Sequence, residues 1–226
     1  PERVLARLME HIPLSEWSGM RKGWAHLFDD MTSKLSLHVS VKETDLHGHI
    51  IQCNSDGTFK VRVGTEDKRY TPEQVTICPK PTKKQELRTW LEEYCEGVKN
   101  HSEPNTWDVT NVTDMSELFK HLHNFNAPID QWDTSKVTDM EAMFDGATTF
   151  NQPLTFDTSK VTDMQSMFSH ARAFNQPLTF DTRNVTNMSA MFWNARAFDQ
   201  PLTFNTSKVT TMRDMFRDAK AFNQPL

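Results

Sequence analysis

The stretch FNQPLTFDT, residues 150–158, returns unchanged at residues 174–182, and the variant FDQPLTFNT begins at residue 198. The chain ends on a further FNQPL. A valine followed by threonine precedes each copy, and the intervals between these valines are 25, 24, 24 and 24 residues. Because a period of about 20–50 residues is typical of stacked repeats, the sequence predicts five repeats of 24–25 residues over 104–226.

Apolar residue types return at fixed places in every repeat. The rows are valine (Val112, Val137, Val161, Val185, Val209), methionine (Met115, Met140, Met164, Met188, Met212) and two of phenylalanine (Phe119, Phe144, Phe168, Phe192, Phe216 and Phe125, Phe150, Phe174, Phe198, Phe222). One repeat cannot bury its own apolar face. Neighbouring repeats are therefore predicted to stack into a solenoid with one continuous core.

Each repeat contains the spacing of a helix face. In the third repeat Met164, Met167, Phe168, Ala171 and Phe174 lie at i, i+3, i+4, i+7 and i+10, which predicts a helix of about three turns. A threonine hydroxyl before this stripe is able to cap the helix N-terminus. The predicted caps are Thr113, Thr138, Thr162, Thr186 and Thr210.

A short strand is predicted after each proline, because proline cannot continue the helix. Leu154 and Phe156 face inward there, and Thr155 and Asp157 face outward. Strands about 4.8 Å apart and helices about 8–10 Å apart would curve the solenoid, with strands on the concave side. The outward strand positions form the candidate binding surface: Thr155, Asp157, Thr179, Asp181, Thr203 and Asn205.

A row of mostly amide side chains stands before the prolines: Asn126, Asn151, Asn175, Asp199 and Asn223. Such a row could bind a ligand. Asparagine in a tight turn also satisfies backbone groups of its own coil and of the next one, as in leucine-rich repeats. We predict this structural turn ladder, in which Asp199 also accepts hydrogen bonds. The threonine rows leave an ice-binding face as an alternative, although threonine is also a good strand former.

The first 103 residues lack the repeat and divide into three segments. Helical apolar spacing predicts N-terminal helices over 1–35, and period-two alternation with an SDGT turn predicts a small β-domain over 36–80. Over 81–103, KKQELRTWLEEYCEGV predicts a linking helix that caps the repeat core. The stretch DGTFKVRVGTEDKRYTPEQVTI resembles an SH3-like or Tudor-like barrel. A methyl-lysine cage in such a barrel needs several aromatic rings, and only Phe59 and Tyr70 are near.

Composition excludes several classes of function. The net charge of −5 divides into about −1 over residues 1–103 and −4 over 104–226, without the basic excess typical of nucleic-acid binding. Three cysteines do not make a disulfide framework. His47, His49 and Cys53 form an H-x-H-x3-C pattern without an obvious fourth ligand for zinc. No phosphate loop or nucleophile motif is present, so we predict no catalytic residues, no metal and no cofactor.

The elements NVTDMSELF, KVTDMEAMFDGATTFNQPL and KVTDMQSMFSHARAFNQPL resemble the BspA-like surface-protein repeat, a relative of the leucine-rich repeat. The resemblance covers residues 104–226. It implies a non-enzymatic solenoid used for adhesion or protein contact, on the cell surface or secreted. If no signal segment was removed, an intracellular location is the alternative.

The expected fold class is α+β: N-terminal helices and a small SH3-like barrel, followed by a leucine-rich-repeat-like α/β solenoid. Our first functional hypothesis is a protein-interaction, adhesion or scaffold module, with a protein partner and no membrane span. One alternative is a Tudor-like head that binds a peptide or nucleic acid, with the solenoid as spacer. Another is a structural subunit that assembles through the open C-terminal solenoid end, since the chain stops within a repeat. The start without methionine and the end within a repeat also predict that the chain is a fragment.

Overall fold

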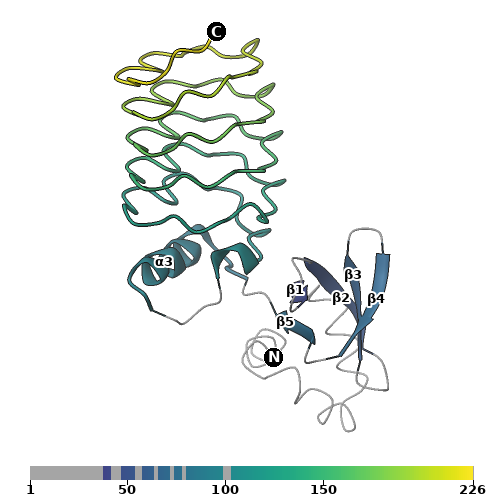
Figure 1. Cartoon of the computed structure of the whole chain (residues 1–226). Helices are drawn as coiled ribbons and strands as arrows, with labels where there is room; N and C mark the ends of the chain where they lie inside the picture. Colours follow the sequence, from purple (N-terminus) through teal and green to yellow (C-terminus); the bar gives the residue numbers. More distant parts are fainter. Residues whose placement is uncertain are drawn as a thin grey trace. The chain divides into compact units, whose positions relative to one another are not determined.

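The computed structural model describes residues 38–41, 47–53, 58–63, 66–71, 74–77, 80–98 and 103–225 (Figure 1). The chain separates into two compact units, Pro1–Pro79 and Lys80–Leu226. The helices predicted over residues 1–35 lie outside the described residues. The finer division of the chain into four segments stays a prediction.

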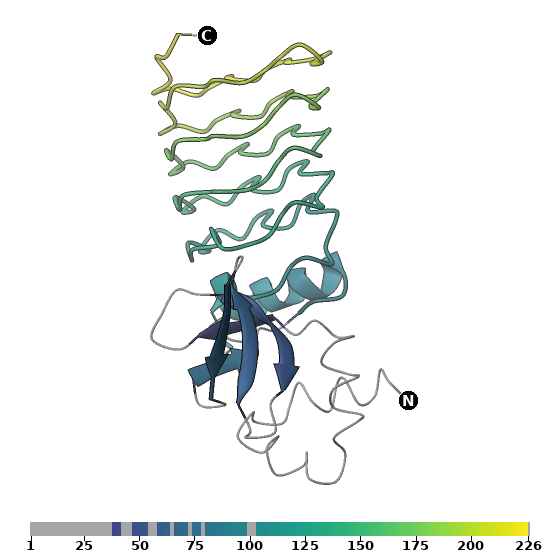
Figure 2. The same cartoon turned by 90° about the vertical axis from the view of Figure 1, so that its right-hand side faces the viewer.

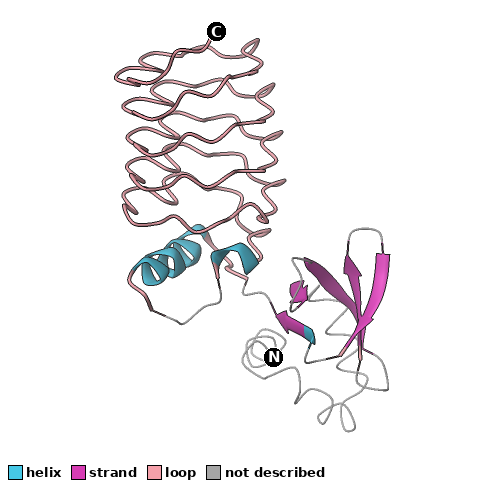
Figure 3. Ribbon diagram, viewed as in Figure 1, coloured by secondary structure: helices cyan, strands magenta, loops and turns pink. Residues whose placement is uncertain are grey.

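The first unit contains a five-stranded antiparallel sheet, drawn in magenta in Figure 3. Its strands are β1 (His38–Val41), β2 (His47–Cys53), β3 (Phe59–Val63), β4 (Glu66–Tyr70) and β5 (Val75–Ile77), in the spatial order β4-β3-β2-β1-β5. The alternation of the sequence places Phe59 and Val61 in the core. Lys60 and Arg62 reach Asp67 on β4 instead, at 3.0 and 2.7 Å. β4 and β5 are the sheet edges, and closure into an SH3-like barrel stays a prediction.

The second unit begins with helix α3 (Lys84–Cys95) and the short 3₁₀ helix η2 (Pro104–Thr106). The repeats follow as five stacked coils. We call them coil 1 (112–136), coil 2 (137–160), coil 3 (161–184), coil 4 (185–208) and coil 5 (209–225). Figure 2 shows the coils edge-on, each lying flat on the one before.

The core of the stack is a pair of phenylalanine columns. Phe168 has no exposed surface and stacks on Phe144 of coil 2 at 5.5 Å and on Phe192 of coil 4 at 5.6 Å between ring centroids. It also stacks on Phe174 of its own coil at 4.2 Å. The same cluster of buried side chains runs from Leu87 in α3 to Met215 in coil 5. The apolar rows of the sequence thus meet in one continuous core.

Backbone hydrogen bonds join each coil to the next, and those of the methionine and phenylalanine stripe run in one direction. In coil 3 the N–H groups of Met164, Ser166, Phe168 and His170 donate to the carbonyls of Asn187, Ser189, Met191 and Trp193 in coil 4. The distances between nitrogen and oxygen are 2.7–3.0 Å. Coils 1, 2 and 4 repeat the pattern toward coils 2, 3 and 5. The alternate amides close turns within the coil, as from Met167 N–H to the Met164 carbonyl.

The helix predicted in each repeat is therefore wrong. Residues 103–225 contain no α-helix as the structure describes them, because a left-handed residue interrupts each stripe. These residues are Glu117, Ala142, Ser166, Ala190 and Asp214, with φ between 50° and 57°. A helix needs about 8–10 Å from its neighbour, whereas the rings of the Phe168 column in successive coils are 4.8–5.6 Å apart. The segment flattens into consecutive turns that still bury the same apolar side chains.

The left-handed residue carries a cost that a glycine would relieve. Ala190 has φ 55°, a conformation that costs about 1–2 kcal/mol for a residue with a Cβ atom. Ala190→Gly is expected to raise the free energy of unfolding by about 0.5–1 kcal/mol. Urea unfolding measures the change. As a control, Ala195→Gly should lower stability, because Ala195 is buried and lacks a positive φ.

The predicted threonine caps have a different role, because there is no helix for them to cap. The hydroxyls of Thr138, Thr162, Thr186 and Thr210 donate to the carbonyls of Thr113, Thr138, Thr162 and Thr186 in the preceding coils, at 3.0–3.4 Å. The threonine N–H groups donate to the same carbonyls at 2.8–3.0 Å. The threonine row is a ladder along the stack.

The predicted strand after each proline is also absent from the described coils. Pro153 has no N–H to donate, and side chains rather than backbone groups make the contacts between coils here. The inward and outward alternation is nevertheless present, since Leu154 and Phe156 are buried while Thr155 and Asp157 are exposed. Without a helical layer, the reason for the predicted curvature disappears.

Helix α3 covers coil 1, at the end of the stack where backbone carbonyls emerge (Figure 1). Leu87 and Leu91 of α3 are fully buried in the shared core. The Arg88 guanidinium donates to the carbonyls of Leu118 and Lys120, both at 2.9 Å. Arg88 thus supplies the donors that a preceding coil would provide, and α3 acts as the end cap of the stack.

Candidate functional site

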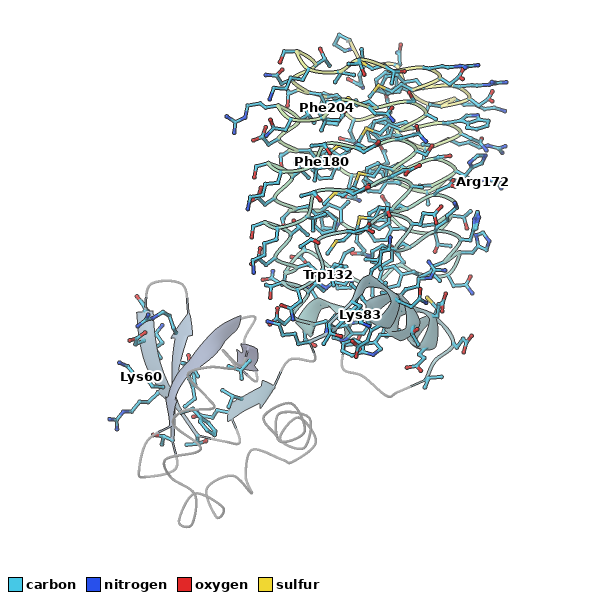
Figure 4. The ribbon with its side chains drawn as sticks, turned by 180° about the vertical axis from the view of Figure 1, so that it is seen from behind. Lys60, Lys83, Trp132, Arg172, Phe180 and Phe204 are labelled. Atoms are coloured by element: carbon cyan, nitrogen blue, oxygen red, sulfur yellow. The ribbon has the colours of Figure 1, made fainter. Side chains whose placement is uncertain are left out.

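The candidate binding surface forms two neighbouring columns of side chains, which we call the outer face. One column holds Thr155, Thr179 and Thr203, and the other holds Asp157, Asp181 and Asn205. Asp181 is partly exposed and the other five residues are exposed. Figure 4 shows Trp132, Phe180 and Phe204 in order up the stack, and Phe180 and Phe204 each lie between two outer-face residues in the chain. Each outer-face residue therefore projects from a rigid, ring-filled layer.

The acidic column holds its own turns together. Oδ1 of Asp157, Asp181 and Asn205 accepts the N–H of Ser159, Arg183 and Ser207, at 2.9, 3.1 and 3.0 Å. These are Asx turns, in which the side chain replaces a backbone acceptor. Substitution of these residues would change the backbone as well as the surface.

The same hydrogen bonds keep the two carboxylates of the outer face ionised. The Ser159 hydroxyl and backbone N–H lower the pKa of Asp157, assisted by the charge of Lys160. The side chain of Arg183 lowers the pKa of Asp181, and the Arg183 guanidinium lies 2.7 Å from that carboxylate. Asp181 therefore has a partner already.

The side chains of the threonine column make fewer hydrogen bonds than those of the acidic column among the described residues. Thr155 donates its hydroxyl to the Asp130 carbonyl. The hydroxyls of Thr179 and Thr203 have no hydrogen-bond partner among the described residues. Threonine hydroxyls and methyls are thus the groups that the outer face offers to another molecule.

The asparagine row lies at the next corner of the coils, where the structure places it as a ladder. Oδ1 of Asn126, Asn151, Asn175 and Asp199 accepts the N–H of Asn151, Asn175, Asp199 and Asn223, at 2.8–2.9 Å. The adjacent glutamines add a second donor, as Gln200 Nε2 does to Asn175 Oδ1 at 3.1 Å. These side-chain oxygens serve the next coil and are not open to a ligand.

Asn175→Ala is expected to lower the free energy of unfolding by about 1–2 kcal/mol, because the Asp199 N–H and the Gln200 amide lose their acceptor. Asn175→Asp keeps an acceptor oxygen and should cost much less. Chemical unfolding of the two variants checks the ladder. Equal losses would show that the side-chain oxygen of Asn175 does not bond to coil 4.

Acidic side chains crowd the turn that begins coils 1–3. Burial raises the pKa of Glu141, and the nearby charges of Asp163, Asp139 and Glu117 raise it further. Oδ1 of Asp139 and Asp163 accepts the N–H of Glu141 and Gln165 in Asx turns, at 2.9 and 2.8 Å. Two of these carboxylates are structural, and Glu141 is the member under electrostatic repulsion.

Glu141→Gln is expected to stabilise the protein by a few tenths of a kcal/mol at pH 7. A raised pKa in the folded state means that stability falls as the pH rises from the unfolded to the folded pKa of Glu141. The gain from the glutamine should therefore be complete above this window and disappear below it. Gln165 occupies the same position in coil 3, so the amide fits. Urea unfolding of the variant and the unaltered chain at about pH 3.5 and about pH 7 measures the difference in stability. These two values lie on either side of the usual pKa of a glutamate side chain.

A hollow of about 360 Å³ lies where α3 meets coil 1, and several cationic residues line it. They are already paired: Lys84 with Asp114 at 2.7 Å, Arg88 with Glu92 at 2.7 Å, and Lys120 with Glu117. The hollow therefore offers no free cation to an anionic ligand.

The other chemical candidates of the sequence are not assembled in the described part of the chain. No group of three potential metal ligands occurs there. The backbone of His47, His49 and Cys53 lies in β2, but their side chains are outside the description. No described helix has the length and apolar character of a membrane span. The absence of catalysis and of cofactors stays a prediction.

Sequence reasoning predicted a capping helix but missed two features that organise this unit. One is the role of Arg88, which donates to the carbonyls of coil 1. Its sequence signal was weak, because a cationic residue on a helix is usually solvated. The other is the hydrogen bonding from the methionine and phenylalanine stripe of each coil to the following coil, whose only trace is the non-helical turn chemistry of the Asp row beginning at Asp114.

Comparison with known proteins gives one result. No curated protein and no solved structure matches the chain. The profile of the family described as "Mycoplasma protein of unknown function, DUF285" matches residues 89–203 and 178–226. These ranges contain the second half of α3 and all five coils, which form one core. The chain belongs to the DUF285 family.

Proposed function

We propose that this protein is a non-enzymatic protein-interaction module, in which the coils display the outer face to a partner protein. The observation that supports this proposal is the exposed threonine column. Thr155, Thr179 and Thr203 repeat once per coil on a scaffold whose neighbouring corners are held by hydrogen bonds between coils. A rigid, regularly spaced surface suits recognition of another protein, since little side-chain freedom is lost on binding.

The resemblance to BspA-like repeats supports a more specific form of this proposal. The VTDM, MF and FNQPL elements resemble BspA-like repeats, whose solenoids serve adhesion or scaffolding on the cell surface. We propose the same class of role here, together with a leucine-rich-repeat-like ancestry of the coils. Surface or secreted placement follows from that reading.

The Tudor-like alternative receives no comparable support. Its binding site would need converging aromatic rings on the sheet of the first unit. Phe59 is 3% exposed and packs in the core, so its ring is not offered to a methylated lysine. Tyr70, opposite Phe59 on β4, is partly exposed.

The outer face is tested with matched triple variants of the full chain. One carries Thr155→Gln, Thr179→Gln and Thr203→Gln, and the control carries Arg172→Gln, Arg196→Gln and Lys220→Gln. Figure 4 shows Arg172 at the opposite edge of the coils from Phe180. Pull-down from the source cell with mass spectrometry identifies the partner, and titration compares affinities.

We expect the threonine variant to lose binding by about tenfold or more, equivalent to about 1.4 kcal/mol. The control should bind as the unaltered chain does. Unchanged binding by the threonine variant, with binding lost in the control, would move the recognition surface to the opposite edge.

A further inference from the structure

One cationic side chain per coil stands at the same repeat position in coils 3, 4 and 5. These residues are Arg172, Arg196 and Lys220, and we call their column the basic edge. All three are exposed, and Figure 4 shows nitrogen-tipped side chains along the edge on which Arg172 is labelled. Arg172 and Arg196 belong to coils that have a neighbouring coil on both sides, so their exposure is a property of this edge.

The cations of the basic edge make no ion pair with a residue in the described part of the chain. Acidic side chains near them in the repeat face other groups: Asp145 lies 3.4 Å from His170, and Asp218 lies 3.9 Å from Arg217. The segments 169–173, 193–197 and 217–221 together carry four basic and one acidic side chain, a net charge of +3, in a chain whose net charge is −5. The basic edge is therefore a local reversal of charge.

Backbone hydrogen bonds fix the spacing of these cations. The Arg172 carbonyl accepts the N–H of Ala197, the residue after Arg196, at 3.2 Å. Strands that are hydrogen-bonded to each other lie about 4.8 Å apart, and the stacked rings of Phe168 and Phe192 in the same coils are 5.6 Å apart. Like charges held at adjacent positions repel each other. An occupant with carboxylates at the same spacing would remove this repulsion.

The spacing favours an α-helix as this occupant. A helix advances about 5.4 Å per turn, so carboxylates one turn apart stay within about 1 Å of register over three coils. Side chains on one face of an extended strand repeat at about 6.6–6.8 Å, and they would drift by about 2–4 Å over the same three coils. Phosphates along one strand of duplex DNA are about 3.4 Å apart, and the net negative charge of the chain also disfavours nucleic acid.

An aromatic ring belongs to the same segment of coil 4. Trp193 is partly exposed, and its ring centroid lies 5.1 Å from that of His170 and 5.5 Å from the Arg217 guanidinium carbon. Tryptophan and arginine are the residue types that most often dominate the binding energy of protein interfaces. Trp193 thus adds apolar surface to an edge that is otherwise cationic.

We propose that the basic edge binds an acidic α-helix of a partner protein. The helix lies along the stack, and its stripe of one carboxylate per turn faces Arg172, Arg196 and Lys220. Each guanidinium offers a planar pair of donors that matches a carboxylate. Acidic side chains one turn apart repel each other in the free helix, so binding relieves repulsion in both partners. This site is separate from the outer face and does not depend on it.

The probe is an alanine-rich helical peptide with one glutamate per turn on a single face. A control peptide has the same composition, with its glutamates distributed around the helix, and circular dichroism checks that both are helical. Each is titrated into the full chain while amide chemical shifts are followed by NMR. We expect the striped peptide to shift the amides of Arg172 and Arg196 and to bind at least about tenfold more tightly than the control. Its binding should weaken as salt is added, because salt screens exposed charges.

Charge-reversed variants of the full chain test the assignment. Arg172→Glu with Arg196→Glu should weaken binding of the striped peptide at least about tenfold. Lys136→Glu with Lys160→Glu makes the same change in charge at two other exposed positions, and it should change binding less than about twofold. The triple threonine variant of the outer face should bind the peptide as the unaltered chain does, which separates this test from that of the outer face.

Three results would overturn the proposal. One is equal binding of the two peptides, or binding of neither, because the register of the helix would then have no effect. Another is equally tight binding of a single-stranded oligonucleotide of the same charge, which would make the edge a general polyanion surface. The third is self-association of the free chain in sedimentation that Arg172→Gln with Arg196→Gln abolishes, because the edge would then belong to a second copy.

Discussion

Replacing Phe168 with alanine is expected to lower the free energy of unfolding by about 3–5 kcal/mol. The ring is fully buried and stacks on Phe144, Phe174 and Phe192. Removing it opens a cavity in the middle of the stack, and the neighbouring coils cannot close it because backbone hydrogen bonds fix their spacing. In a repeat protein, each unit also depends on its nearest neighbours. Loss at coil 3 therefore weakens contacts in both directions.

Phe222→Ala is the matched control for this prediction. Phe222 belongs to the second phenylalanine column but lies in coil 5, partly buried, with ring contacts to Phe198 and Phe216. We expect a loss of about 1–2 kcal/mol, because less apolar surface returns to water. Urea denaturation followed by circular dichroism measures both variants. Equal losses would contradict a core in which Phe168 is fully buried and Phe222 only partly buried.

Arg88→Ala is expected to cost about 2–3 kcal/mol. The substitution leaves the carbonyls of Leu118 and Lys120 without their charged donor, and it also removes the ion pair with Glu92. Lysine retains the charge but not the planar fork of donors. Arg88→Lys should therefore recover only part of the loss.

The comparison for Arg88 is Thr89→Ala on the exposed side of α3. Thr89 bonds only to the Gln85 carbonyl of its own helix among the described contacts. Its replacement should change stability by less than about 0.5 kcal/mol. If Arg88→Ala were as mild as Thr89→Ala in chemical denaturation, α3 would not be the cap of the coil 1 carbonyls.

Much of the second unit could be predicted from the repeat itself. The intervals between valines set the coil length, and the rows of methionine and phenylalanine identified the buried side chains. The turn ladder followed from asparagine chemistry, because an asparagine in a tight turn bonds to backbone groups of its own coil and of the next one. These features depend on one coil and its immediate copy, which a single sequence contains.

The backbone of the coils could not be predicted in the same way. Spacings of i, i+3 and i+4 place side chains on one face of a helix, but successive tight turns produce the same spacing. Ala142 and Ala190 are good helix formers, yet both are left-handed in the structure. The distance between adjacent coils decides between the two conformations, and that distance is a property of the assembled stack.

The candidate surface was likewise predicted only in part. Alternation predicted that Thr155 and Asp157 face outward, and both are exposed. It did not predict that Asp157 and Asp181 close Asx turns, since this depends on the backbone two residues ahead. The role of Arg88 could not be predicted from the sequence either, because it depends on where α3 lies against coil 1.

Hydrogen bonding between coils is the central claim, and scalar coupling across hydrogen bonds tests it directly. In a long-range HNCO experiment, the amide nitrogen of Phe168 should couple to the carbonyl carbon of Met191 in coil 4. The Met164 and His170 amides should couple in the same way to Asn187 and Trp193. A helical repeat would instead couple the Phe168 amide to the Met164 carbonyl, four residues earlier. That coupling would contradict a stack of coils in which this stripe donates to the following coil.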